Sequence, residues 1–508
     1  MGRRPHCILL AATIIILLGT AAARAEEVNF SLSDCLRRAL DASLEVRSGR
    51  YLTPIAQTGI TEAESEFDHL LSFRASGGKS ITPAASFFAG ATELKEQTFA
   101  GGLEVGQKVR TGGYYAFGIQ TNDLVTNSQF YNFRPLWTSG LTFRFEQPLL
   151  RSAGVTYNEI QIRLAEKNLT AAEANYRGVL ERTMAEVELA YWNLVFLRED
   201  YEVKQYSLRV AEELLDISRR RLAAGAGTRV ELIQAEAGVA DRETQLILAE
   251  QAIRGGEDAL RAYVFPFAED TLAEIRIVPT DTVTGELPKI DEELARRLRT
   301  AFDFRPDVIA ARARLESAGI RVVQKENELL PRLDVFGSLG YSGLEDTLEG
   351  STGDVWRFEY PAWQIGLTLE IPLGNRGARS RYRRALLERS QSIAEFESLR
   401  NRVIVDVRSA LRVIETARRG IAATEKANAA AEAQFEAEKV RLAADRSTNY
   451  FLLQKQSDLT EAQTSVLLAY VTYRRALVGL EAASGTYLAA RGLLAPPPKD
   501  EPEEPEDD

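Results

Sequence analysis

Two very long stretches of this chain contain no proline. They cover residues 149–265 and 373–495, and both are rich in Ala, Leu, Glu and Arg. Proline breaks helix interiors, whereas these four residues favour helices, so each stretch can form helices far longer than those of ordinary globular domains. Helices of that length need partners along their whole length. The chain is therefore expected to be mainly α-helical.

Each proline-free stretch begins just after a segment that resembles a β-strand. The first segment ends in FEQPLLR (145–151) and the second in LEIPLGN (369–375). Apolar and polar residues alternate in both segments, which is the period of a strand with two different faces. The recurrence predicts two tandem repeats, at residues 26–290 and 291–495. Each would consist of strands followed by a long helical hairpin.

The first 25 residues have the features of a secretory signal peptide. Arg3 and Arg4 precede an apolar run at residues 8–18, and Ala23-Arg24-Ala25 is a typical cleavage site. A membrane anchor is the alternative, but the run is short for a bilayer span. Cleavage leaves Cys35 as the single cysteine, so no internal disulfide is expected. Residues 496–508 are prolines, acids and one lysine, and are expected to form a disordered tail.

The strands are expected at about residues 67–147 in the first repeat and 332–371 in the second. No apolar run after the cleavage site reaches the roughly 20 residues of a transmembrane helix, so membrane insertion would have to use strands. Aromatic residues cluster beside both groups of strands, and such residues favour a bilayer interface. The alternative is that they cap a soluble sheet. The clusters are Phe87, Phe88, Phe130, Tyr131, Phe133 and Trp137, and then Trp356, Phe358, Tyr360 and Trp363.

The first repeat contains one further hairpin candidate. Its strands are predicted at residues 99–109 and 114–122, turning at Thr111-Gly112-Gly113. The sequence leaves open whether this hairpin belongs to the membrane part.

The helical hairpins are predicted at about residues 152–263 and 376–490. Apolar residues in both follow the alternating three- and four-residue spacing of a coiled-coil seam. Each stretch is interrupted once, at residues 223–228 and 444–449. Glycine followed by threonine suits a helix reversal in the first interruption. The seam residues are Leu180, Met184, Val187, Tyr191 and Leu194 in the first hairpin, and Val403, Val407, Ala410, Ile414, Ala417 and Ile421 in the second.

The order of these segments resembles the TolC-type outer-membrane efflux proteins over nearly all of the mature chain. Shorter motifs add to the likeness, among them the helix start at Arg305-Pro306-Asp307 and a helical pattern at 32–40 that recurs at 294–301. By resemblance, three copies would form one β-barrel with four strands per protomer. This barrel would be continuous with an α-helical barrel in the periplasm of a Gram-negative-type cell.

The resemblance implies an outer-membrane channel rather than an enzyme. Such a channel is the passive exit duct of a tripartite efflux system. Its implied partners are two further copies, outer-membrane lipid, a periplasmic adaptor and, through the adaptor, an inner-membrane pump of the RND or ABC type. No cofactor is expected, because His69 and Cys35 are read as structural and no phosphate-binding loop of the Walker type is present. A formal net charge of −11 makes nucleic acid an unexpected partner.

The resemblance also suggests functional residues at the two helix reversals. A periplasmic gate is expected there, although Phe451 and Gln454 stand where relatives often have aspartates. Asp445 and Arg446 could compensate by pairing with neighbours, including Arg229 or Glu231. The candidate gate residues are Arg229, Glu231, Asp445, Arg446, Phe451 and Gln454, and the candidate adaptor contacts are Gly225, Gly227, Thr228, Ser447 and Thr448.

Several alternatives stay open at this point. The duct could serve type I protein secretion instead of drug efflux, and the exported substrate is not encoded in any recognisable motif. A periplasmic coiled-coil adaptor or scaffold would show one helical hairpin rather than two. A secreted helical enzyme would need a convergent set of titratable residues, which the sequence does not offer.

Overall fold

The computed structural model describes residues 27–83, 92–266, 276–285, 287–288 and 293–493. The predicted signal peptide, the acidic tail and the aromatic residues Phe87 and Phe88 lie outside this part. The chain forms two compact units. One contains Met1–Leu44, Met184–Pro288 and Glu415–Val478, and the other contains Glu45–Thr183, Lys289–Ile414 and Gly479–Asp508. Each unit takes segments from both predicted repeats, because the long helices run through both units.

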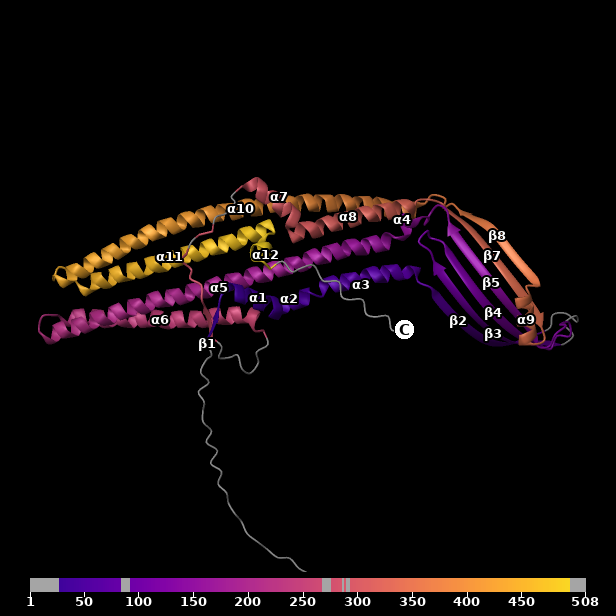
Figure 1. The fold of residues 1–508 in the computed structure, drawn as a ribbon, viewed down its shortest axis with the longest axis horizontal. Helices are drawn as coiled ribbons and strands as arrows, with labels where there is room; N and C mark the ends of the chain where they lie inside the picture. Colours follow the sequence, from indigo (N-terminus) through magenta and orange to yellow (C-terminus); the bar gives the residue numbers. More distant parts are fainter. Residues whose placement is uncertain (1–26, 84–91, 267–275, 286, 289–292, 494–508) are drawn as a thin grey trace, which may run out of the picture. The chain divides into compact units, whose positions relative to one another are not determined.

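The first unit contains the far ends of two helical hairpins. In one hairpin α5 (Ile160–Ala223) is followed by α6 (Arg229–Val264), and in the other α10 (Arg376–Ala443) is followed by α11 (Asn449–Ser484) (Figure 1). Both breaks fall in the interruptions read from the sequence. A buried cluster of Leu214, Phe435, Leu452 and Leu459 brings residues of α5, α10 and α11 together.

A short parallel pair of strands and one helix complete the described part of the first unit. Strand β1 (Glu27–Phe30) pairs with β6 (Arg276–Pro279), and α1 (Leu32–Ala42) follows β1 with a capping box formed by Ser31 and Asp34. Cys35 is fully buried in α1. Burial raises the pKa of its thiol to about 12, so the thiol stays neutral at physiological pH.

The second unit contains the remaining helices and a sheet. Its helical core joins α7 (Leu294–Phe304) and α8 (Pro306–Asn327) to α10, because Ala301, Val308, Val403 and Val407 form one buried cluster. Pro306 occupies the first turn of α8, as the sequence motif predicts. The other elements are α2 (Leu44–Gly49), α3 (Leu52–Glu64), η1 (Ser65–Phe67), α4 (Val155–Asn158), α9 (Leu348–Arg357) and α12 (Tyr487–Ala490).

The predicted coiled-coil seam is confirmed by burial. All five seam residues of the first hairpin are buried, and so are those of the second hairpin except Ala410, which is half-buried. His69 lies exposed immediately before the first strand of the sheet.

The sheet has six antiparallel strands in the order β2-β3-β4-β5-β7-β8 (Figure 1). The sheet of one copy thus has two strands more than the four per protomer that the resemblance implied for the barrel. The additional hairpin of the first repeat is inserted into the sheet between β2 and β5, where each of its strands finds a partner on both sides. The strands are β2 (Leu70–Pro83), β3 (Glu93–Lys108), β4 (Tyr114–Thr126), β5 (Leu136–Pro148), β7 (Arg332–Glu345) and β8 (Tyr360–Glu370).

Candidate functional site

The two hairpin tips of the first unit close with the same backbone geometry. In the first tip the N–H of Ala226 donates to the carbonyl of Arg221, and the N–H of Gly225 donates to that of Leu222. In the second tip Arg446 and Asp445 make the same pair of bonds, to Arg441 and Leu442. This is the Schellman pattern, which needs a left-handed residue after the helix. Gly225 (φ +71°) fills that place in one tip and Asp445 (φ +55°) in the other.

Glu231 has a structural role at the first tip. Thr228 precedes α6, and its side-chain oxygen accepts from the N–H of Glu231 at 3.2 Å. The Glu231 carboxylate accepts from the N–H of Thr228 at 3.0 Å in return. This reciprocal capping box satisfies two backbone donors at the helix start. Glu231 is thus held by the start of its own helix.

An ion pair joins the two tips. Nη2 of Arg221, in the last turn of α5, lies 2.7 Å from Oδ1 of Asp445. The hydrogen bond to Asp445 raises the pKa of Arg221. The sequence suggested that Asp445 and Arg446 pair with neighbours, among them Arg229 or Glu231. In the structure the partner of Asp445 is Arg221, which lies in the first helix of the other hairpin.

Asn449 was missed by the sequence analysis although it links the same two tips. Its side chain is buried, and its amide donates to Oγ of Ser218 at 2.8 Å and to the carbonyl of Glu231 at 3.1 Å. The available signal was an asparagine at the first position of a helix, where such residues are common. That signal indicates a helix start but does not reveal a partner more than two hundred residues away.

The remaining candidate residues differ in their surroundings. Arg229, Arg446 and Phe451 are exposed, and the ring of Phe451 packs edge-on against Tyr450. Gln454 donates to Asp458 at 3.0 Å, and this bond, together with Lys455, lowers the pKa of Asp458. Of the candidate adaptor contacts, Gly225, Thr228 and Thr448 are exposed, whereas Gly227 and Ser447 are half-buried.

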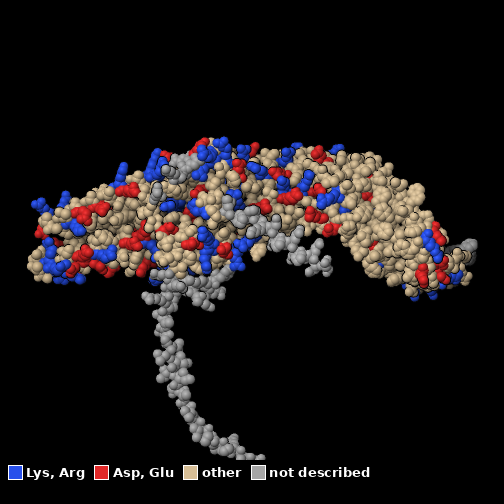
Figure 2. All heavy atoms as spheres, in the orientation of Figure 1, with Lys and Arg blue, Asp and Glu red and all other residues tan. Residues whose placement is uncertain are grey.

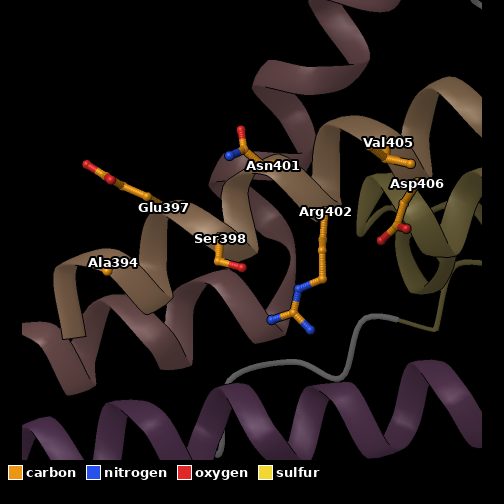
Figure 3. Close-up of a pocket in the computed structure, with 7 residues that line it drawn as sticks. All are labelled: Ala394, Glu397, Ser398, Asn401, Arg402, Val405 and Asp406. Carbon is orange, nitrogen blue, oxygen red and sulfur yellow. The ribbon is translucent and has the colours of Figure 1, made fainter. Parts of the chain in front are cut away.

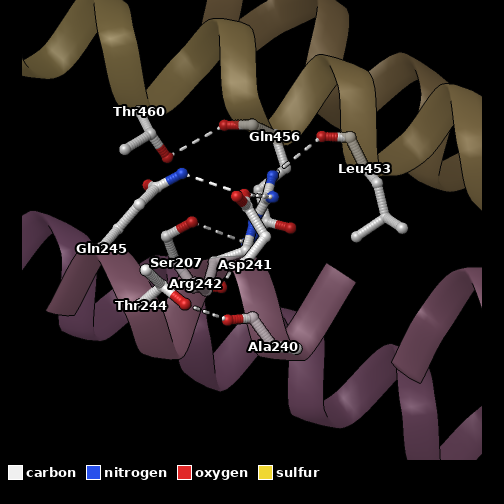
Figure 4. Close-up of polar contacts among 9 residues, drawn as sticks. All are labelled: Ser207, Ala240, Asp241, Arg242, Thr244, Gln245, Leu453, Gln456 and Thr460. Carbon is white, nitrogen blue, oxygen red and sulfur yellow. Dashed lines mark hydrogen bonds and ion pairs between the residues drawn. The ribbon is translucent and has the colours of Figure 1, made fainter. Parts of the chain in front are cut away.

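Behind the tips, polar side chains connect the two hairpins a second time (Figure 4). Arg242 of α6 is almost fully buried and donates to the backbone carbonyl of Leu453 in α11 at 3.2 Å. Gln456 of α11 donates to the carbonyl of Ser207 in α5 at 2.6 Å. Buried polar groups are costly unless they are paired, so these contacts favour one relative register of the two hairpins.

The sheet of the second unit has two chemically different faces. One face carries small or polar residues in its middle rows, for example Ser72, Glu104, Gly118, Thr142, Gly340 and Ala362. The neighbouring row points to the opposite face and reads Leu71, Val105, Phe117, Phe143, Leu339 and Trp363, all of which are exposed. Figure 2 shows few charged residues on the visible part of the sheet, in contrast to the helices.

The polar face borders a hollow of about 750 Å³. Among its lining residues are Arg74, Glu104, Gln120 and Arg144, and an ion pair joins Arg144 to Glu104. A smaller hollow lies along one face of α10 between Ala394 and Asp406 (Figure 3). Asp406 there pairs with Arg305 at 3.1 Å. In the part of the chain that the structure describes, no group of three His, Cys, Asp or Glu side chains could hold a metal ion.

Among the described helices, none combines the length and the apolar character needed to cross a membrane. A family model described as "Outer membrane efflux protein" matches residues 144–264 and 298–486, more than half of the chain. This chain belongs to the outer membrane efflux protein family. Membership makes the protein an outer-membrane component of efflux or export systems, with a helical part in the periplasm.

Individual relatives are distant but share much of the length. The outer membrane efflux protein BepC of Brucella suis is 23% identical in an alignment that covers 61% of this chain and 64% of BepC. The pyoverdine export outer membrane protein OpmQ of Pseudomonas aeruginosa is 24% identical over 79% of each chain. The fold resembles the CmeC outer membrane channel of Campylobacter jejuni, with a TM-score of 0.67, 16% identity, and coverage of 90% of this chain and 86% of CmeC.

Proposed function

We propose that this chain is the exit duct of a tripartite efflux system and passively conducts small molecules to the cell exterior. Three copies would close one β-barrel in the outer membrane and one helical barrel in the periplasm. The observation that carries the proposal is the two-faced sheet. Its exposed apolar face suits contact with lipid, and its polar face suits a water-filled lumen.

The edges of the sheet support closure by further copies. Strands β2 and β8 each pair on one side only within the described chain. An open strand edge in lipid would leave backbone N–H and C=O groups without partners, at several kcal/mol each. Because six antiparallel strands alternate in direction, β8 of one copy and β2 of the next run antiparallel. Pairing between copies would therefore continue the same ladder and remove every edge.

The helix tips are proposed as the periplasmic gate and adaptor contact. The ion pair between Arg221 and Asp445 joins two hairpins of one copy, and threefold symmetry would repeat it around the lumen. Exposed Arg229, Arg446 and Phe451 would lie beside it. The adaptor would contact the exposed turn residues Gly225, Thr228 and Thr448 together with Gly227 and Ser447. An inner-membrane pump would supply both the energy and the choice of substrate.

Fractionation followed by reconstitution tests the proposal. We expect the protein in outer membranes as a detergent-stable trimer that forms ion-conducting channels in planar bilayers. Asp445→Asn should increase the mean conductance, because it removes the charge that pairs with Arg221. The matched control Asp216→Asn removes a carboxylate that pairs with Arg220 within α5 and should leave the conductance unchanged. A detergent-independent soluble monomer would contradict the exit duct, whereas unchanged conductance of the Asp445 variant would contradict only the gate.

A further inference from the structure

We propose that the hairpin β3–β4 is part of the membrane wall, so that each copy contributes six strands and the trimer closes an eighteen-stranded barrel. The inference rests on the proposed trimeric duct and concerns the lumen that this duct offers. The family match does not supply it, because the first matched segment begins at residue 144, after β4. The alternative is a hairpin that lies outside a twelve-stranded wall.

The strand pairing is continuous through the inserted hairpin. Strand β2 pairs with β3 from Leu70↔Gly106 to Pro83↔Glu93, along its whole length. Strand β4 then pairs with β5 from Tyr114↔Glu146 to Leu124↔Leu136. A hairpin that only decorated the sheet would leave β2 and β5 in direct contact. Here the two inserted strands separate them completely.

The inserted strands also keep the two-faced pattern of the rest of the sheet. On the apolar face, β3 presents Phe99, Leu103 and Val105, and β4 presents Phe117 and Val125, and all of these side chains are exposed. On the opposite face Ala100, Gly102, Glu104, Gly118, Gln120 and Asn122 are small or polar and border the hollow. Gly101, Thr121 and Asp123 interrupt the apolar face of the hairpin. A soluble extension would have no reason to expose this many large apolar side chains on one face.

An ion pair ties the hairpin to the repeat that surrounds it. Arg144 of β5 contacts Glu104 of β3 across the intervening strand β4. Gly118 lies between them in the ladder, paired with Glu104 on one side and Thr142 on the other. A Cβ at Gly118 would lie 3.5 Å from Cβ of Glu104, which is an ordinary contact distance. This contact lies on the polar face and would be repeated three times in the lumen.

The additional strands widen the barrel and so increase the size of the solute that can pass through it. With strands about 4.8 Å apart and tilted by about 40°, eighteen strands give a barrel about 35 Å across between backbones, and twelve give about 24 Å. Eighteen-stranded barrels leave an open aqueous channel. Gly102, Gly118, Gly140 and Gly340 have no side chains, which keeps the lumen side of the wall thin. The duct would therefore admit polymeric solutes, such as polypeptide segments, at its outer end.

Cross-linking in outer membranes tests the strand order. In a Cys35→Ala background, Phe117→Cys with Phe143→Cys should cross-link within one chain, because these residues are paired neighbours. Phe73→Cys with Phe143→Cys is the matched control and should not cross-link, since two strands separate them by about 14 Å. Phe73→Cys combined in turn with Trp363→Cys, Ile365→Cys or Leu367→Cys should give covalent dimers and trimers in at least one combination. Cross-linking of the control pair would overturn the six-strand wall.

Labelling with reagents added outside the cell tests the width of the barrel lumen. Thr142→Cys lies on the polar face of β5 and should react with maleimide-polyethylene glycols of graded size. Deleting residues 93–126 joins β2 to β5 through a loop, and the largest reagent that labels Thr142→Cys should then fall in radius by about a third. An unchanged size limit in a deletion trimer would overturn the inference. If the deletion variant does not assemble, the cross-links in the full chain decide the matter. Absence of any outer-membrane trimer would instead contradict the proposed duct.

Discussion

The two repeats are alike at their helix tips and different in their sheets. Both tips use the same backbone turn, with Gly225 in one and Asp445 in the other at the left-handed position. The first repeat supplies four strands to the sheet and the second supplies two. Few backbone conformations can form a tight turn, whereas a sheet can take up a further hairpin if the strands remain paired and their side chains stay on the same faces. The two repeats therefore share the geometry of their helix tips and differ in the number of their strands.

The largest expected effect tests whether strands of both repeats face lipid. Phe117→Arg in the inserted hairpin and Leu367→Arg in β8 should each destabilise the assembled protein by about 2–4 kcal/mol, because both place a charge on the apolar face. The control Gln120→Arg lies on the polar face and should assemble normally. The measurement is the fraction of heat-modifiable trimer in outer membranes. Normal assembly of Phe117→Arg alone would show that the repeats differ in more than strand number.

The second test separates the buried contact between the tips from their exposed residues. Asn449→Ala should destabilise the folded protein by about 1–3 kcal/mol, because the Ser218 hydroxyl and the Glu231 carbonyl lose their common donor. Arg229→Ala, at the equivalent first position of α6, should change stability by less than about 0.5 kcal/mol, because Arg229 is exposed. Thermal unfolding in detergent measures both. Equal losses of stability in the two variants would mean that the first residues of α6 and α11 contribute alike, contrary to their different contacts.

A smaller effect is expected from the left-handed residues themselves. Gly225→Ala should cost about 1–2 kcal/mol, since a side chain at φ +71° is strained even though open space surrounds the position. Asp445→Gly removes such a side chain and should lower the unfolding temperature less than Gly225→Ala does. Comparing the two variants by calorimetry isolates backbone strain. If Asp445→Gly lowered the unfolding temperature more than Gly225→Ala, the contact between Asp445 and Arg221 would contribute more to stability than the relief of backbone strain.

The smallest expected effect is the change of stability with pH near neutrality, and it concerns a difference between the N-terminal helices of the two repeats. Cys35 of α1 stands where the recurring pattern places Arg297 in α7. Its pKa of about 12 lies above the value near 8.5 expected in the unfolded chain. Burial of the neutral thiol thus stabilises the fold fully below pH 8.5, and this contribution is lost as the pH rises toward 12. Thiol labelling should be slow at pH 7 in native protein and fast after unfolding. Rapid labelling at pH 7 would contradict the buried site.

Sequence periodicity predicted the local features well. The absence of proline and the three- and four-residue spacing gave the long helices, their buried seam and their breaks near residues 224 and 444. Alternation identified the strands that lead into the long helices, and the glycine-containing turn at 111–113 identified the inserted hairpin. It did not place that hairpin in the sheet, because alternation describes the faces of a strand and says nothing about its neighbours.

The partners of the tip residues were also beyond the sequence. Glu231 follows Thr228 at the spacing of a capping box, so its structural role could have been read from the chain. Arg221 and Asn449 gave no comparable signal, because their partners belong to the other hairpin.

The sequence by itself determined that this protein has long paired helices, a duplicated plan and two-faced strands, because each property follows from the spacing of residues along the chain. Only the tertiary structure decided that six strands form one sheet and that Arg221 meets Asp445. Those facts depend on contacts between distant segments, which form when strand edges pair and helices pack, and no local pattern specifies them.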